Sequence, residues 1–183
     1  LVGISYYCPE HGIEILASPT DGLITEYPLL SYYDTVLIEI AKYYFDTGQY
    51  PEAVPLYLRV ASDLESEWAD LAAFQAAVAT FRQIRGIDYD QRLIQEADRL
   101  FDRYLQEFRR GDHVEEAQAF RRQISEMEGT KNLGIAKYYL RESKLDAAQI
   151  YLDRVLRDFP NSDAAREARE IQADLDRLDP RRS

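Results

Sequence analysis

The sequence predicts an all-α fold: a tetratricopeptide-like array of helical hairpins, stacked as a right-handed α-solenoid. Three observations support this prediction. Apolar residues recur at helical spacing from about residue 32 onward, Gly and Pro fall between those segments and not inside them, and the chain contains an internal repeat. Residues that favour helices, mainly Ala, Leu, Glu, Arg and Gln, dominate the central and C-terminal parts.

The internal repeat begins with a pentapeptide, Ile-Ala-Lys-Tyr-Tyr, which stands at 40–44 and again at 135–139. In both copies, two helical segments flank a short polar break, which predicts a helical hairpin. The small residues of the two helices are 12 positions apart, the tetratricopeptide spacing that lets paired helices approach closely. We therefore expect these residues to pack the hairpins: Ala41, Tyr44, Ala53, Tyr57, Ala97, Phe101, Ala136, Tyr139, Ala148 and Leu152.

These patterns divide the chain into six segments. They are an irregular N-terminal segment with a partial repeat (1–30), a hairpin (31–64), a second hairpin (67–110), a long helix with a third hairpin (113–160), a C-terminal capping helix (162–178) and a tail (179–183). We expect residues 20–27 to form the second helix of the partial repeat. Whether Gly129-Thr130 divides the long helix or lies within one continuous helix stays open, and either Asn161 or Ser162 is expected to cap the last helix.

Charge and composition exclude several classes of partner. Acidic residues outnumber basic ones by 33 to 22, and the net charge of -11 opposes binding to nucleic acid or to anionic lipid surfaces. No apolar stretch approaches the roughly 20 residues needed to cross a bilayer. We therefore expect protein partners, no nucleic acid, and membrane attachment only through a lipid anchor upstream of this sequence.

Catalytic and metal-binding patterns are weak. The two histidines, His11 and His113, lie at no spacing that brings a nucleophile and a base together, and we expect His113 to face solvent. Cys8 and His11 supply only two of the four ligands of a structural zinc site. We expect no enzyme, no cofactor and no metal. The alternative is a domain of an enzyme with a carboxylate-rich cleft between hairpins.

The tetratricopeptide register predicts a concave groove for a partner protein. Its expected lining is Thr35, Ile38, Lys42, Phe45, Asp46, Thr130, Leu133, Lys137, Leu140 and Arg141. Lys42 and Lys137 occupy equivalent positions and are candidates to pair with a carboxylate of the partner. The alternative is a lysine stem lying over a tyrosine with its charge in water. Adjacent tyrosines, as at 43–44 and 138–139, point about 100° apart, so one of each pair can be exposed.

Residues 136–168 resemble the tetratricopeptide lipoproteins of bacterial envelopes, above all the BamD-like β-barrel assembly lipoproteins. The resemblance is carried by Ala-Lys-Tyr-Tyr-Leu at 136–140, Tyr-Leu-Asp-Arg-Val-Leu at 151–156 and Asp-Phe-Pro-Asn-Ser at 158–162, and the pattern extends over about residues 31–178. It implies a scaffold on the periplasmic face of the outer membrane that contacts the membrane-embedded barrel-assembly protein. A periplasmic repeat protein of the Tol-Pal type and a cytoplasmic adaptor with the same fold are the alternatives.

Overall fold

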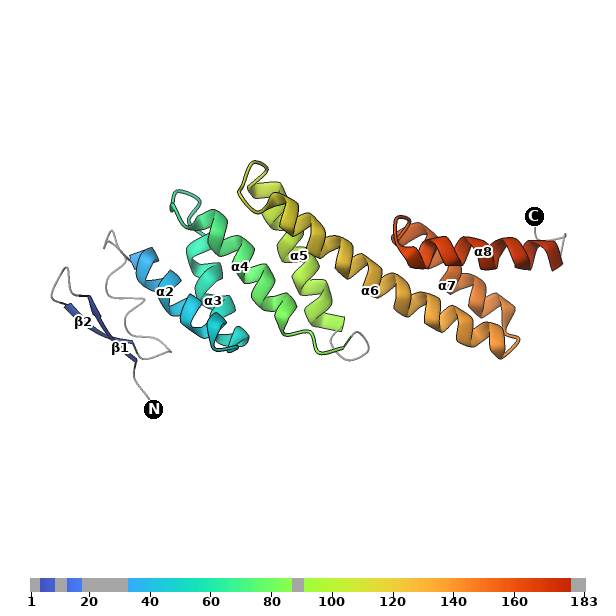
Figure 1. Ribbon diagram of the computed structural model, residues 1–183, viewed down its shortest axis with the longest axis horizontal. Coiled ribbons are helices and arrows are strands. Elements are labelled where there is room, and N and C mark those ends of the chain that lie inside the picture. The colour runs from blue at the N-terminus through green and yellow to red at the C-terminus, as the bar shows by residue number, and fades with distance from the viewer. Residues whose placement is uncertain (1–3, 9–12, 18–32, 87–90, 179–183) are drawn as a thin grey trace.

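The structure is a computed structural model that describes residues 4–8, 13–17, 33–86 and 91–178. From residue 33 onward the described elements are α-helices that follow one another as an elongated array (Figure 1). They are α2 (Tyr33–Asp46), α3 (Tyr50–Ala61), α4 (Ala69–Arg82), α5 (Gln91–Glu107), α6 (Val114–Arg141), α7 (Leu145–Asp158) and α8 (Asp163–Leu178). Each helix packs against the next along the chain, and α8 also packs against α6. The fold is therefore the predicted stack of helical hairpins.

Two short strands precede the helices. β1 (Ile4–Cys8) pairs antiparallel with β2 (Ile13–Ala17), so that Ile4 lies opposite Ala17 and Cys8 opposite Ile13. These strands were not predicted, because residues 1–30 were expected to be irregular, although both strands are rich in the β-branched and aromatic residues that favour them. The expected helix at residues 20–27 lies outside the described residues.

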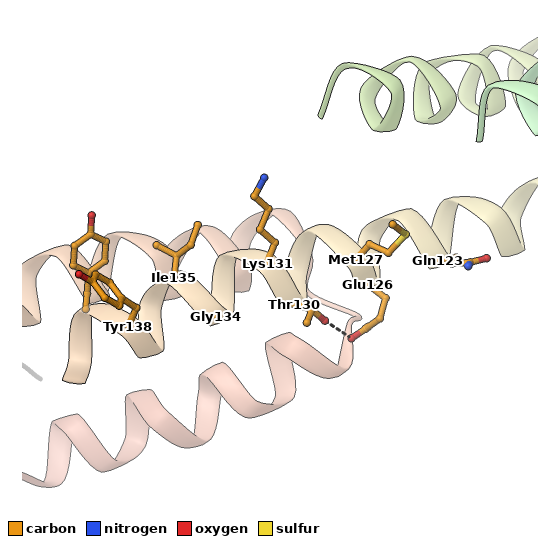
Figure 2. Close-up of a pocket in the computed structure, with 9 residues that line it drawn as sticks. Gln123, Glu126, Met127, Thr130, Lys131, Gly134, Ile135 and Tyr138 are labelled. Carbon is orange, nitrogen blue, oxygen red and sulfur yellow. Dashed lines mark hydrogen bonds between the residues drawn. The ribbon is translucent and has the colours of Figure 1, made fainter. Parts of the chain in front are cut away.

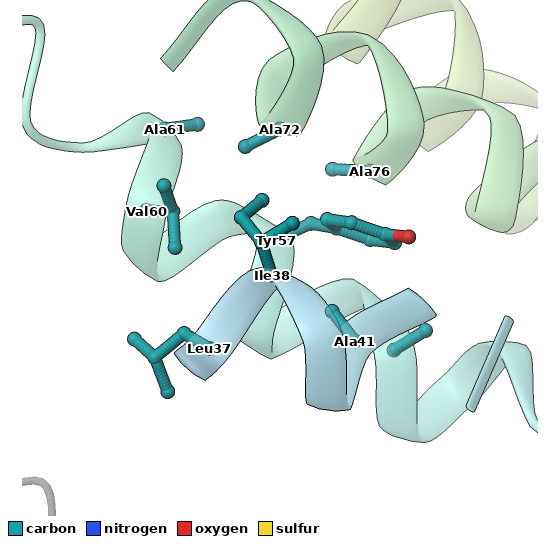
Figure 3. Close-up of a cluster of buried hydrophobic side chains, with 9 residues drawn as sticks. Leu37, Ile38, Ala41, Tyr57, Val60, Ala61, Ala72 and Ala76 are labelled. Atoms are coloured by element: carbon teal, nitrogen blue, oxygen red, sulfur yellow. The ribbon is translucent and has the colours of Figure 1, made fainter. Parts of the chain in front are cut away.

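The first core joins α2 and α3. Ala41 and Ala53 are fully buried in it, and their small side chains let the two helices approach closely while Tyr57 fills the space beside them. Two alanines of the next helix, Ala72 and Ala76, enter the same cluster (Figure 3). The first hairpin and the start of the second therefore share one continuous core.

The second core is aromatic and joins α4, α5 and the first half of α6. The rings of Phe101 and Phe120 stack with their centroids 4.9 Å apart. Phe74 of α4 lies 6.3 Å from Phe120 and 5.7 Å from Tyr104. Buried Ala97 and Ala117 lie in the same cluster. The start of α6 is thus anchored on the second hairpin.

Helix α6 is continuous over its 28 residues, or about 42 Å, so Gly129 does not divide it. A single interior glycine costs a helix only about 1 kcal/mol relative to alanine, which packing along both halves of α6 offsets. Its second half packs against α7 and α8, in a third core formed by Leu133, Ala136, Leu152, Val155, Ala164, Ala165 and Ala168. One helix therefore bridges two units of the array.

The start of α8 is fixed by a side-chain cap and by α6. Ser162 Oγ accepts a hydrogen bond from the backbone N–H of Ala165 at 3.0 Å and donates one to the carbonyl oxygen of Phe159 at 2.8 Å. Of the two predicted caps, Ser162 is therefore the one used. Glu126 of α6 accepts a hydrogen bond from the backbone N–H of Asp163 at 2.8 Å, which ties the two helices together.

Candidate protein-binding surface

The predicted groove residues on α2 do not form an open surface. Ile38 is only 4% exposed and belongs to the first core, so its assignment to the groove was wrong. Thr35 is covered in part by the start of α4, because its hydroxyl oxygen accepts a hydrogen bond from the indole Nε1–H of Trp68 at 3.2 Å. The remaining three are half-buried or exposed: Phe45, Lys42 and Asp46.

On α6, the face that carries the predicted groove residues Leu133 and Lys137 packs against α8. Leu133, the repeat equivalent of Ile38, is likewise 4% exposed and lies in the third core, so this assignment was wrong too. Lys137 Nζ lies 2.6 Å from a carboxylate oxygen of Glu167 on α8, which engages its charge within the chain. The other three are half-buried or exposed: Leu140, Thr130 and Arg141.

An open groove lies on the neighbouring face of α6, about one residue, or 100°, around the helix from the predicted face. Its volume is about 680 Å³. Figure 2 shows Met127, Lys131 and Ile135 projecting from one side of the helix. The full lining is Gln123, Glu126, Met127, Thr130, Lys131, Gly134, Ile135, Tyr138 and Tyr139. We call this set the α6 groove.

The α6 groove is mainly apolar and is bounded by α5 at one end. Lys131 Nζ donates a hydrogen bond to the side-chain oxygen of Gln91, the first residue of α5, at 3.0 Å. The other end carries Tyr138, which is 49% exposed. Between them Gly134 is exposed and adds no side chain. An exposed apolar strip of this kind is typical of a surface that binds another protein.

Of the adjacent tyrosines at 43–44 and at 138–139, one of each pair is exposed and the other is half-buried, as the helical spacing of neighbouring residues predicts. Tyr43 and Tyr138, at equivalent repeat positions, are 54% and 49% exposed, whereas Tyr44 and Tyr139 are half-buried. Tyr139 stacks on Tyr151 of α7 with ring centroids 5.7 Å apart. The sequence therefore contains one indication of the groove. Both copies of the pentapeptide place an exposed tyrosine, Tyr43 or Tyr138, two residues after the buried alanine.

A polar corner joins α4, α5 and the start of α6. The hydroxyl of Tyr104 donates to Asp70 Oδ1 at 2.6 Å and accepts from the backbone N–H of His113 at 3.1 Å. Burial, followed by the hydrogen bond to Asp70, raises the pKa of Tyr104 above its ordinary value. His113 is not solvent-facing as predicted, because its ring stacks on Phe74 with centroids 4.4 Å apart. The hydrogen bonds of Tyr104 therefore join α5 to α4 and to the residue that precedes α6.

Metal ligands do not gather in the part of the chain that the structure describes: no group of three or more His, Cys, Asp or Glu side chains there could hold an ion. Cys8 lies at the end of β1, and His11, its candidate partner, lies outside the described residues. None of the described helices is long and apolar enough to cross a membrane.

A stack of helical hairpins that leaves an apolar groove open along one helix defines a class of protein, the tetratricopeptide-like scaffolds that bind other proteins. The chain belongs to the YfiO family of outer membrane lipoproteins, whose family model matches residues 20–178. Membership places it in the cell envelope. No curated protein matches the chain.

Proposed function

We propose that the chain is a non-catalytic scaffold in the assembly of outer membrane β-barrel proteins, a BamD-like component on the periplasmic face of the outer membrane. A lipid anchor upstream of this sequence would hold it there, and its partner would be the membrane-embedded barrel-assembly protein. The observation that carries the proposal is the match to an outer membrane lipoprotein family over residues 20–178, which include α2 to α8.

The surface of the chain supports a protein partner in preference to lipid. A net charge of -11 opposes close contact with anionic headgroups. The α6 groove offers an exposed aromatic side chain, Tyr138, beside the aliphatic Ile135, the kind of surface that dominates protein interfaces. The pairing of Lys42 with a carboxylate of the partner is part of the same proposal, since Lys42 is exposed while Lys137 faces Glu167.

The proposal is tested by controlled depletion of the full-length protein in its own bacterium. Folded, heat-modifiable β-barrel proteins in the outer membrane should decrease while their unfolded forms accumulate in the periplasm. In detergent extracts, the tagged protein should co-purify with the barrel-assembly protein in a fixed ratio.

Two outcomes contradict the proposal. One is depletion that leaves the folded barrel proteins at their normal level. The other is a tagged protein that co-purifies with Tol-Pal components and not with the barrel-assembly protein, which would assign the scaffold to the alternative system.

A further inference from the structure

The α6 groove occupies a position that another helix of this chain uses to pack on its neighbour. In α4 the fully buried Ala77 faces its own hairpin partner in the second core. Trp68, Ala72 and Ala76, which precede Ala77 by nine, five and one residues, instead pack against the preceding hairpin in the first core. This stripe, which begins at the residue before α4 and continues along it, is therefore the face that receives the preceding helix, α3.

In α6 the fully buried alanine that faces its own hairpin partner is Ala136, which packs with residues of α7 and α8, so we take it as the counterpart of Ala77. The residues nine, five and one positions before it are Met127, Lys131 and Ile135. All three line the α6 groove. The positions through which α4 packs against α3 thus have counterparts in α6, at the same spacing from the buried alanine. In α6 these positions line an open groove.

The groove also continues an existing helix interface. α5 packs along the first half of α6 and begins at Gln91, whose side chain donates a hydrogen bond to Glu128 at 2.7 Å and accepts one from Lys131. α6 runs on to Arg141, ten residues beyond Lys131. A helix laid in the groove would extend the layer that α5 forms.

We propose that the α6 groove binds an amphipathic α-helix of a partner protein, aligned along α6 as a continuation of the α5 layer. Its apolar stripe should carry small residues opposite Ile135 and Tyr138, as Ala61, Ala72 and Ala76 do where α3 meets α4. Gly134 lets the partner backbone approach α6 closely. This inference names the kind of segment that binds, and it deepens the proposed function without depending on which protein supplies the helix.

The geometry makes a helix distinguishable from an extended segment. Met127 and Tyr138 are 11 residues apart, which is about 16 Å along α6 at 1.5 Å per residue. A partner helix aligned with α6 covers that distance in about 11 residues. An extended strand covers it in about 5 residues at 3.3 Å each. The spacing of the partner residues that meet the two positions therefore reports the partner's local structure.

The experiment is photo-crosslinking in the source bacterium. The full-length protein carries a photoreactive phenylalanine at Met127 in one strain, at Tyr138 in a second, and at the exposed Ala119, outside the groove, in a control strain. Mass spectrometry then identifies the linked residues of the partner. We expect both groove positions to link to one segment of another protein, at residues about 11 apart with apolar residues at three- and four-residue spacing.

A matched pair of substitutions tests the groove itself. Apart from the adjoining backbone of its own helix and its two chain neighbours, a Cβ built at Gly134 would meet no described atom within 4 Å, so Gly134→Leu should fold and fill the groove. We expect it to lower the crosslinking yield at Tyr138 at least tenfold, with no fall in melting temperature. Ala119→Leu, a change of similar size at an exposed site of the same helix, should leave the yield unchanged.

Linked residues about 5 apart, links only to a second copy of this chain, or no links above the Ala119 control would overturn the inference. A helix from a protein other than the barrel-assembly protein would support the inference and contradict the proposed partner. Normal co-purification of the barrel-assembly protein with Gly134→Leu would refute the groove as its docking site and leave the proposed function standing.

Discussion

Replacing Gly134 by alanine should stabilise the protein, whereas the same replacement at Gly129, five residues earlier in α6, should not. Both glycines lie inside one helix, where alanine is favoured over glycine by about 0.8–1 kcal/mol. Their surroundings differ. Gly134 is exposed, and a Cβ there would meet no described atom within 4 Å beyond the adjoining backbone of its own helix and its two chain neighbours. Gly129 is buried against the start of α8.

The expected gain at Gly134 is therefore nearly the whole difference in helix propensity, about 0.8 kcal/mol. For a chain of this size, 1 kcal/mol shifts the melting temperature by about 2–4 °C. Gly134→Ala should raise the melting temperature by about 2–3 °C.

At Gly129 a Cβ would lie 3.0 Å from Ser162 Oγ and 3.2 Å from the Cβ of Ala164. Ser162 cannot move aside freely, because its hydroxyl caps α8 and also bonds the carbonyl of Phe159. Overpacking of this kind costs about 1–3 kcal/mol, which cancels or exceeds the propensity gain. We expect Gly129→Ala to be neutral or to destabilise the protein by up to about 2 kcal/mol.

The assay is urea denaturation of both variants, followed by circular dichroism, with thermal melts alongside. Equal stabilisation by the two substitutions would refute the reasoning, because it would mean that α8 does not pack against α6 at Gly129.

Three further predictions concern individual contacts. Tyr104→Phe should lower the free energy of unfolding by about 1–3 kcal/mol, since it leaves the Asp70 carboxylate short of a donor in a partly buried corner; a urea midpoint equal to wild type would contradict this. Arg121→Met should cost less than about 1 kcal/mol, because its bridges to Asp98 and Asp102 are partly exposed, and most of the loss should vanish in 1 M salt, as urea melts at two salt concentrations would show. Burial, then nearby carboxylates, raises the pKa of Tyr57 from 10.0 to about 12. The unfolded chain loses this proton first, so stability that is fully present below pH 10 should fall as pH rises toward 12, and Tyr57→Phe should show a shallower fall in urea midpoint over this range.

The helical hairpins could be predicted because they depend on local and periodic signals. Ala41, Ala53, Ala136 and Ala148 are all fully buried, since a small residue at this position is what close packing of two helices requires. Helix ends also carry local signals, such as the Ser162 cap.

The groove could not be placed from the sequence, because it depends on which neighbouring helix covers each face of α6. The register identified a face that includes Leu133 and Lys137, but α8 folds back over that face. The return of α8 is a long-range contact with no local signature. The strand pair at 4–8 and 13–17 was missed for a related reason, since five-residue strands give little periodicity to recognise.

The proposed function and the proposed role of the α6 groove meet in one claim, that the barrel-assembly protein binds in this groove. Biolayer interferometry with the purified periplasmic part of the barrel-assembly protein measures this directly, for the Tyr138→Ala variant and for Tyr43→Ala, its repeat-equivalent control of similar exposure. Truncating an aromatic side chain that anchors an interface costs about 2 kcal/mol, so Tyr138→Ala should weaken binding by about 30-fold, and Tyr43→Ala by less than twofold. Unchanged affinity in the Tyr138 variant, or equal losses in the two, would contradict binding of the barrel-assembly protein in this groove.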